Sequence, residues 1–177
     1  MADGILKVGT ITTSSGSGTI TIPDAVTVSS ASLSNSPAFF STGVSSSQAL
    51  GNQTYTTLTN WNTPSSLLGS VTFSNGIYTL GTAGTYFFYA IPDIGNLADG
   101  DRAFVVIQAS EDSFSSSSDI SVNGKTMNAS ANADVTPQVS CIHTCTASTQ
   151  VRVQAWQDYG GNRNFQGGYF MGYKLIG

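Results

Sequence analysis

The residues best suited to chemistry lie in one short segment, Cys141-Ile-His143-Thr-Cys145. In an extended strand these three side chains point the same way, with about 6.6 Å between successive members. Thiolate and imidazole groups bind zinc and copper, but neighbouring extended positions cannot converge on one tetrahedral ion unless the strand bulges. A disulfide also needs a bend, because its Cα atoms must lie within about 7 Å of each other. We favour two small buried thiols beside a polar neighbour; a metal site and a disulfide are the alternatives.

A second candidate site is a glycine-containing segment that holds Asp93, Asp99 and Asp101. Oxygen-rich loops of this kind can bind calcium. The segment lacks the bidentate Glu and the ligand spacing of known calcium loops, so turn formation is the simpler interpretation. We therefore expect no metal and no cofactor.

A catalytic constellation is difficult to assemble from this sequence. The chain has one His, so a Ser-His-Asp triad would have to use His143, which lies between two thiols. Glu111 and Asp112 form the only adjacent acid pair of the sequence and lie in a Ser-rich segment, although glycosidase carboxylates can come from distant positions. We expect no catalytic residues and no enzyme activity.

Recognition is the remaining chemistry, and three residues are candidates for binding a receptor. Trp61 lies in the polar segment Asn60-Trp-Asn-Thr-Pro64, and Tyr159 and Arg163 lie in a Gly/Asn-rich loop. Aromatic side chains in loops can stack on sugars or anchor protein contacts. Ordinary packing is the alternative for Tyr159 and Arg163.

Composition restricts the elements that can position these residues. Only 9% of the residues are charged, with 10 acids against 6 bases, whereas the average is near 25%. Such a chain has no basic face for nucleic acid and no polybasic membrane patch. Ser, Thr and Gly dominate while Glu and Lys are scarce, which favours strands and turns over helices. No apolar run approaches the roughly 20 residues of a membrane span, and the N-terminus does not resemble a signal peptide.

Residues 1–36 differ from the rest and are predicted to form an attachment arm and linker. Short alternating segments joined by Ser and Gly cannot bury a core alone. A strand that exposes one row of apolar side chains needs another surface to lie on, so we expect this arm to bind another protein; an unstructured leader is the alternative. The predicted partner-binding residues are Ile5, Leu6, Val8, Ile11, Ile20, Ile22, Val26 and Val28.

Residues 37–177 are predicted to form one all-β domain. Short alternating segments recur with turn signals about 8 to 12 residues apart, which is typical of an antiparallel sandwich or jelly roll. A hairpin turn is expected at Asn123-Gly124. The expected strands include 38–41, 53–58, 69–73, 77–80, 85–91, 103–109, 120–122, 125–127, 135–146, 149–157 and 168–176.

One segment is more specific than this pattern. Tyr78-Thr-Leu-Gly-Thr-Ala-Gly84-Thr-Tyr86-Phe-Phe88 resembles the signature of the complement globular-head and tumour-necrosis-factor-like jelly rolls, although that signature expects a further aromatic where this chain has Ala90. The segment from Phe165 to Leu175 is similar to the closing strand of that family, which lies near a trimer axis. The resemblance implies a homotrimer with Tyr86, Phe88, Tyr169, Met171 and Tyr173 as interface candidates.

Residues 4–22 resemble the leader of short virion proteins of tailed phages, especially marine and cyanobacterial ones. This resemblance implies a virion-surface protein, made in the host cytoplasm, whose arm binds the major capsid protein or a tail or fibre adaptor. We expect a homotrimeric capsid decoration or cement protein, because the sequence has no shaft or coiled coil between leader and domain. A tail-fibre or head-fibre knob that binds a host receptor or glycan is the alternative.

Overall fold

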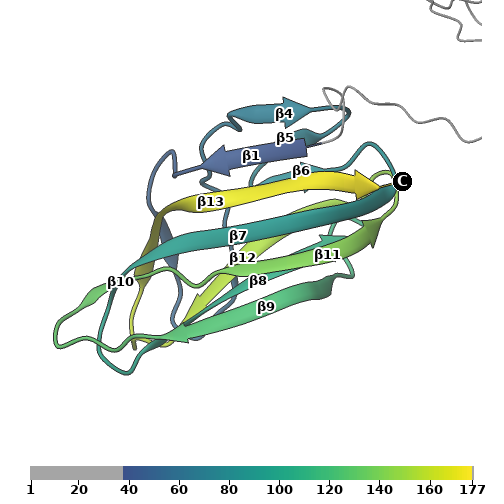
Figure 1. Ribbon diagram of the computed structural model, residues 1–177. Coiled ribbons are helices and arrows are strands. Elements are labelled where there is room, and N and C mark those ends of the chain that lie inside the picture. Colours follow the sequence, from purple (N-terminus) through teal and green to yellow (C-terminus); the bar gives the residue numbers. More distant parts are fainter. Residues whose placement is uncertain (1–37, 177) are drawn as a thin grey trace, which may run out of the picture. The chain divides into compact units, whose positions relative to one another are not determined.

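A computed structural model describes residues 38–176 (Figure 1). The predicted arm, including its apolar residues from Ile5 to Val28, lies outside the described residues. Within the described part of the chain, no helix is long and apolar enough to cross a membrane.

Residues 38–176 form thirteen strands and no helix. The strands are β1 Ala38–Thr42, β2 Gln48–Leu50, β3 Thr56–Thr57, β4 Ser66–Leu68, β5 Thr72–Ser74, β6 Ile77–Thr79, β7 Gly84–Leu97, β8 Arg102–Ser110, β9 Ser118–Thr126, β10 Ala133–Val135, β11 Val139–Cys145, β12 Gln150–Gln157 and β13 Arg163–Ile176.

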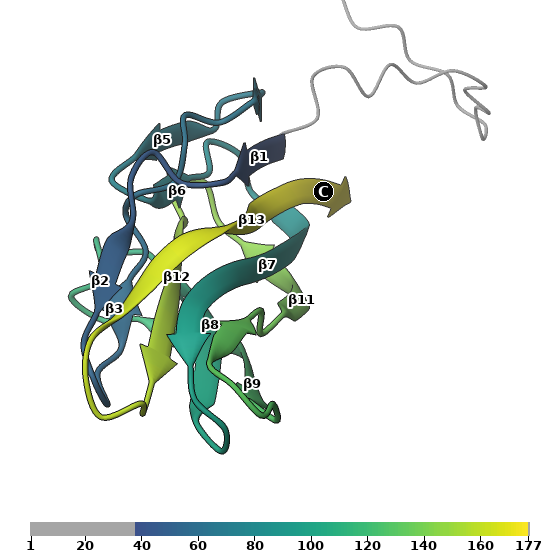
Figure 2. The same ribbon diagram turned by 90° about the vertical axis from the view of Figure 1, so that its left-hand side faces the viewer.

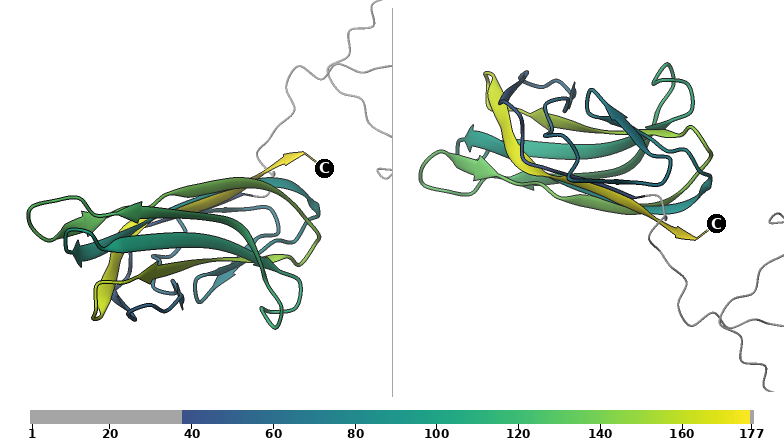
Figure 3. Two further views of the ribbon diagram at one scale, coloured as in Figure 1. Left: turned by 90° about the horizontal axis from the view of Figure 1, so that it is seen from below. Right: turned by 90° about the horizontal axis from the view of Figure 1, so that it is seen from above.

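The strands form two sheets that pack face to face, seen from two directions in Figures 2 and 3. The first sheet has the order β10-β7-β13-β1-β4, with β11 also beside β7 and β2 also beside β13. The second has the order β5-β6-β12-β8-β9, with β3 also beside β12. These strand pairings are all antiparallel. The predicted all-β jelly-roll sandwich is therefore confirmed for the described residues.

The core lies between the two sheets and follows the two-residue alternation of the strands. On β7, Tyr86, Phe88 and Ala90 are all fully buried. Val151 and Val153 of β12, in the second sheet, are also fully buried and belong to the same core cluster. Alternation along the sequence therefore decides which side chain enters the core and which reaches the outer face of its sheet.

Aromatic rings fill the part of the core beneath β1. Phe39 stacks on Tyr78, with ring centroids 3.7 Å apart, and Phe170 meets both rings edge-on at 5.2 Å. The Tyr78 hydroxyl forms a buried hydrogen bond with the Ser41 hydroxyl. Satisfying this polar atom allows a tyrosine to occupy a fully buried position.

The predicted hairpin at Asn123-Gly124 is wrong. Both residues lie inside β9, which pairs with β8 from Ser118 to Thr126. Phe104 is the β8 partner of Gly124, and a Cβ at Gly124 would lie 2.4 Å from Cε1 of this ring. The glycine therefore permits a close side-chain approach rather than a turn, a role that isolated strand glycines often have.

Gly172 serves the same purpose in the core. A Cβ at this position would lie 2.7 Å from ring atoms of Phe39 and Phe88. β13 can therefore pack against the Phe39 and Phe88 rings only because position 172 has no side chain.

We expect Gly172→Ala to destabilise the domain by about 1 to 3 kcal/mol, because the added methyl group overpacks two buried rings. Gly167→Ala on the same strand is the matched control, since its Cβ would lie at an ordinary 3.5 Å from Asp93. The measurement is the urea midpoint of each variant. Equal midpoints for Gly172→Ala and the unaltered chain would contradict this account of the core.

Candidate functional site

The outer face of the first sheet carries a continuous set of apolar side chains, which we call the aromatic face. Strand register brings them together: Phe87 lies opposite Tyr173, Tyr89 opposite Met171, and Ile91 opposite Tyr169. None of its members is charged. The aromatic face comprises Phe40 of β1, Phe87, Tyr89 and Ile91 of β7, Ile142 of β11, and Tyr169, Met171 and Tyr173 of β13.

This face is open to solvent in the single chain. Ile142 is 66% exposed, Tyr169 48% and Tyr173 40%. The rings also pack on one another: Phe40 stacks on Tyr169 with centroids 5.9 Å apart, and Phe87 lies 5.3 Å from Tyr173. Contiguous exposed apolar patches of this kind mark interaction sites.

Two of the predicted interface residues lie elsewhere. Tyr86 and Phe88 are fully buried and stack on each other at 5.8 Å, so they form core contacts within the chain instead of contacts between chains. Phe87 and Tyr89, their immediate neighbours, occupy the outer face. The two-residue alternation separates these pairs in the sequence, but only the position of the second sheet decides which pair is covered.

The structure also buries the predicted receptor residue Trp61. Its side chain is 3% exposed and meets Phe165 edge-on, with ring centroids 4.6 Å apart. The polar residues around Trp61 in the sequence suggested a surface loop, but its ring packs into the core. Trp61 is therefore not a receptor contact in this structure.

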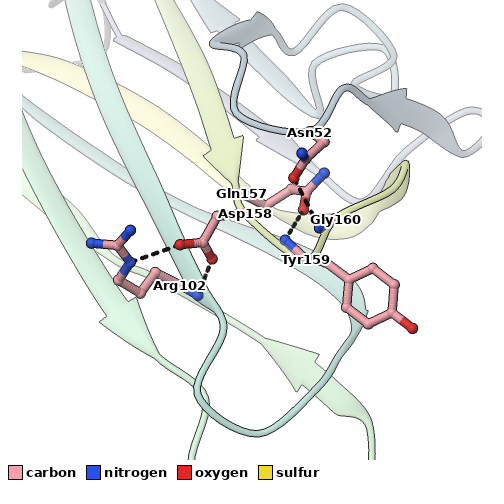
Figure 4. A network of polar contacts seen from close by, with 6 residues as sticks. All are labelled: Asn52, Arg102, Gln157, Asp158, Tyr159 and Gly160. Carbon is pink, nitrogen blue, oxygen red and sulfur yellow. Dashed lines mark hydrogen bonds and ion pairs between the residues drawn. The ribbon is translucent and has the colours of Figure 1, made fainter.

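Tyr159, in the loop that joins β12 to β13, lies beside Arg163, the first residue of β13. The Arg163 guanidinium lies over the Tyr159 ring, and both side chains are half-buried. In Figure 4 the Tyr159 ring points away from the polar network that holds its backbone. This pair remains a candidate recognition site.

The buried side-chain amide of Gln157 holds the loop between β12 and β13 in place. Gln157 is fully buried; its side-chain nitrogen donates to the carbonyls of Leu50 (3.2 Å) and Gly161 (2.8 Å), and its oxygen accepts from the Tyr159 amide (2.7 Å). Asn52 accepts a further bond from the Gly160 amide at 2.9 Å (Figure 4). These bonds satisfy backbone groups that a turn leaves unpaired, and they tie the loop after β2 to the loop after β12.

The predicted Asp-rich segment divides between strand and turn. β7 continues through Asp93 as far as Leu97, so only the segment that follows is a loop. There Asp101 accepts a hydrogen bond from the Ala98 amide (2.8 Å), and Asp99 accepts one from the Ala129 amide (3.2 Å). Asp101 therefore closes a backbone turn, the simpler interpretation drawn from the sequence, whereas Asp99 ties this loop to the segment after β9.

The two cysteines lie on β11, where they face the core. Cys145 is buried, Cys141 is half-buried, and both are free thiols. β11 pairs with β7 without a break from Cys141 to Cys145, so four extended residues place their Cα atoms about 13 Å apart. That separation excludes a disulfide between them in this conformation. Among the described residues, no cluster of three or more His, Cys, Asp or Glu could hold a metal ion.

Burial also makes these thiols unreactive. It raises the pKa of Cys141 from 9.0 to about 11. Burial, with the nearby Glu111 carboxylate, raises that of Cys145 to about 11 as well. Because the thiolate is the nucleophile and the metal ligand, both groups are protonated and inert at neutral pH.

The stability of the domain should therefore fall as the pH rises above 9.0, the ordinary pKa of these thiols. In that range the unfolded chain loses thiol protons that the folded chain retains, so the free energy of unfolding decreases. Tyr78 adds to the fall above pH 10.0, because burial raises its pKa to about 12. Urea midpoints measured across this range test the expectation.

The matched control is the double variant Cys141→Ala with Cys145→Ala, which should lose the part of the decline that begins near pH 9.0 and keep the later part. A midpoint that stays constant between pH 9.0 and 11 would contradict the buried state of the thiols.

Both residues of the adjacent acid pair accept hydrogen bonds within the domain. The two Glu111 carboxylate oxygens accept hydrogen bonds from the hydroxyl groups of Thr146 and Thr149. Asp112 accepts from Ser110 (2.8 Å) and from the Ser116 amide (2.9 Å), and these bonds lower the pKa of its carboxyl, with Ser116 contributing most. Glu111 therefore ties the end of β8 to the turn between β11 and β12. Asp112 closes a turn in the Ser-rich loop between β8 and β9.

Comparison with known proteins supports the fold. No family model and no curated protein matches the sequence, but solved structures match the domain. The structure of Eiger TNF from S. frugiperda aligns with a TM-score of 0.64 at 12% identity, covering 80% of this chain and 94% of that chain. The globular domain of zebrafish complement 1qA protein aligns with a TM-score of 0.57 at 13% identity, covering 80% and 98%. At these identities the likeness shows that the domain has the jelly-roll fold of TNF-like and complement globular-head proteins, as its motifs predict.

Proposed function

We propose that this chain is a non-enzymatic structural protein of a virion surface and works as a homotrimer whose subunits associate through the aromatic face. The observation that carries this proposal is the aromatic face itself, an uncharged set of exposed rings on one side of the sandwich. A monomer would leave this surface in water, at a cost that association removes.

The composition of the aromatic face suits a permanent contact between subunits. Tyr, Phe and Met are enriched in the cores of protein interfaces, and charged residues are depleted there. Tyr89, Tyr169 and Tyr173 each combine an apolar ring with a hydroxyl that can find a partner across an interface. The resemblance to trimeric TNF-like jelly rolls favours three subunits over two.

The virion role is supported by the leader of the sequence. Residues 4–22 resemble the leaders of phage virion proteins, and the apolar residues of the arm are suited to lie on a neighbouring capsid, tail or fibre protein. We favour capsid decoration, with the arm on the major capsid protein and the knob directed outward. The proposed absence of a catalytic role is supported by Glu111 and Asp112, whose carboxylates accept hydrogen bonds from hydroxyl and amide groups of the domain, and by the protonated thiols.

Placing a charge in the aromatic face should break the assembly. Tyr173→Arg would bury an unpaired cation in each subunit contact, at a cost of about 3 kcal/mol or more. Light scattering should therefore show a loss of mass toward the single chain, with the β-sheet circular dichroism retained. Thr72→Arg, an exposed position on β5 of the other sheet, is the control and should leave the mass unchanged. Equal masses for both variants would contradict the assignment of the interface.

The decoration role predicts a high copy number. Quantitative mass spectrometry of purified virions should find this chain in amounts comparable to the major capsid protein. A chain that lacks residues 1–36 should fail to load onto virions. A few copies per virion would instead assign the protein to a tail or fibre, and absence from virions would contradict the proposal.

A further inference from the structure

Three aromatic side chains form a row across the outer face of the second sheet. Trp156 of β12 lies opposite Phe104 of β8, and the pairing of Ala155 with Thr56 places Tyr55 beside Trp156 on the other side. The ring centroids of Phe104 and Trp156 are 5.3 Å apart, and those of Trp156 and Tyr55 are 6.5 Å apart. We call Tyr55, Trp156 and Phe104 the aromatic row.

The aromatic row belongs to the surface. The alternate residues Val105 and Ala155 point inward and are fully buried, whereas Phe104 and Trp156 are only half-buried and Tyr55 is 48% exposed. Phe104 lies against Gly124, where a side chain would collide with it. Phe104 is thus packed against Gly124 and the Trp156 ring before any ligand arrives, which lowers the entropy lost on binding.

Polar groups flank the aromatic row on both sides. On one side Arg102 and Asp158 form an ion pair at 2.8 Å (Figure 4), and the Arg102 guanidinium carbon lies 5.7 Å from the Trp156 ring centre. On the other side Gln154 donates to the Thr57 hydroxyl at 3.2 Å. The ion pair has no net charge, and the Arg102 side chain is 56% exposed.

We propose that the aromatic row binds a neutral saccharide. A sugar presents an apolar C–H face that packs on aromatic rings, and hydroxyl groups at its edge that hydrogen-bond to amide, hydroxyl, guanidinium and carboxylate groups. The aromatic row and its flanks supply both kinds of group side by side. A chain with net charge −4 and a flanking pair of opposite charges disfavours anionic polymers such as nucleic acids and acidic glycans.

This proposal goes beyond the proposed function and does not depend on it. The aromatic row lies on the second sheet and the aromatic face on the first, so a chain can use both surfaces at once. Saccharide binding would hold for a monomer as well as for a trimer, and for a capsid as well as a fibre location.

Tryptophan fluorescence of the full chain provides the test, because the sequence has only two tryptophans. Trp61 is buried in the core, so a change in emission on adding a ligand reports on Trp156. The probes are three neutral polymers, mannan, dextran and galactan, with heparin as the anionic comparison. We expect the emission to move to shorter wavelength with at least one neutral polymer and not with heparin.

Variants assign the response to the aromatic row. Tyr55→Ala, at a half-exposed loop position, should fold and should weaken binding by about tenfold. Trp156→Phe keeps a ring and should retain binding in affinity electrophoresis, whereas Trp156→Ala should lose it. Ile77→Ala is the control, since Ile77 pairs with Arg152 on the same sheet away from the aromatic row.

Three results would overturn the proposal. Binding to none of the neutral polymers would contradict saccharide binding at the aromatic row. A response to heparin alone would assign a charged ligand. A loss of binding in Tyr159→Ala, with none in Tyr55→Ala, would move the site to the loop between β12 and β13.

Discussion

The antiparallel pairing of β7 with β13 is the constraint on which the rest of the structure depends. These two strands of 14 residues lie side by side along most of their length. Their register sends Tyr86 and Phe88 into the core and Phe87 and Tyr89 to the outer face. A slip of one residue would exchange the two sets, so a single pairing produces both the core and the proposed contact between subunits.

The two outer faces of the sandwich differ in chemistry and therefore in what they can bind. The aromatic face is apolar and uncharged, which suits contact with other subunits of the same chain. The aromatic row is narrower and lies between an Arg102–Asp158 ion pair and a Gln154–Thr57 hydrogen bond, which suits a ligand with hydroxyl groups. A structural protein with one face for assembly and another for adhesion would account for both surfaces.

The sequence predicted most of the fold because alternation and turn residues are local signals. It predicted less of the candidate site, because the burial of a side chain is decided by contacts with residues far away in the sequence. The alternation around Tyr86 separated two faces without showing which one the second sheet covers. Trp61 has polar neighbours in the chain but packs on Phe165 in space. The dipeptide Asn123-Gly124 is typical of a hairpin turn, yet both residues pair with β8 as part of a continuous strand. The Phe104 ring occupies the space where a side chain at position 124 would lie.

Sedimentation equilibrium of the unaltered full-length chain, over a range of concentrations, tests the central claim most directly. The claim is that the aromatic face is buried between three copies. The account predicts one species of about 55 kDa, three times the 18.4 kDa of the chain, that persists on dilution. A species of 18.4 kDa at every concentration would contradict it, because the aromatic face would then be stable in water without a partner.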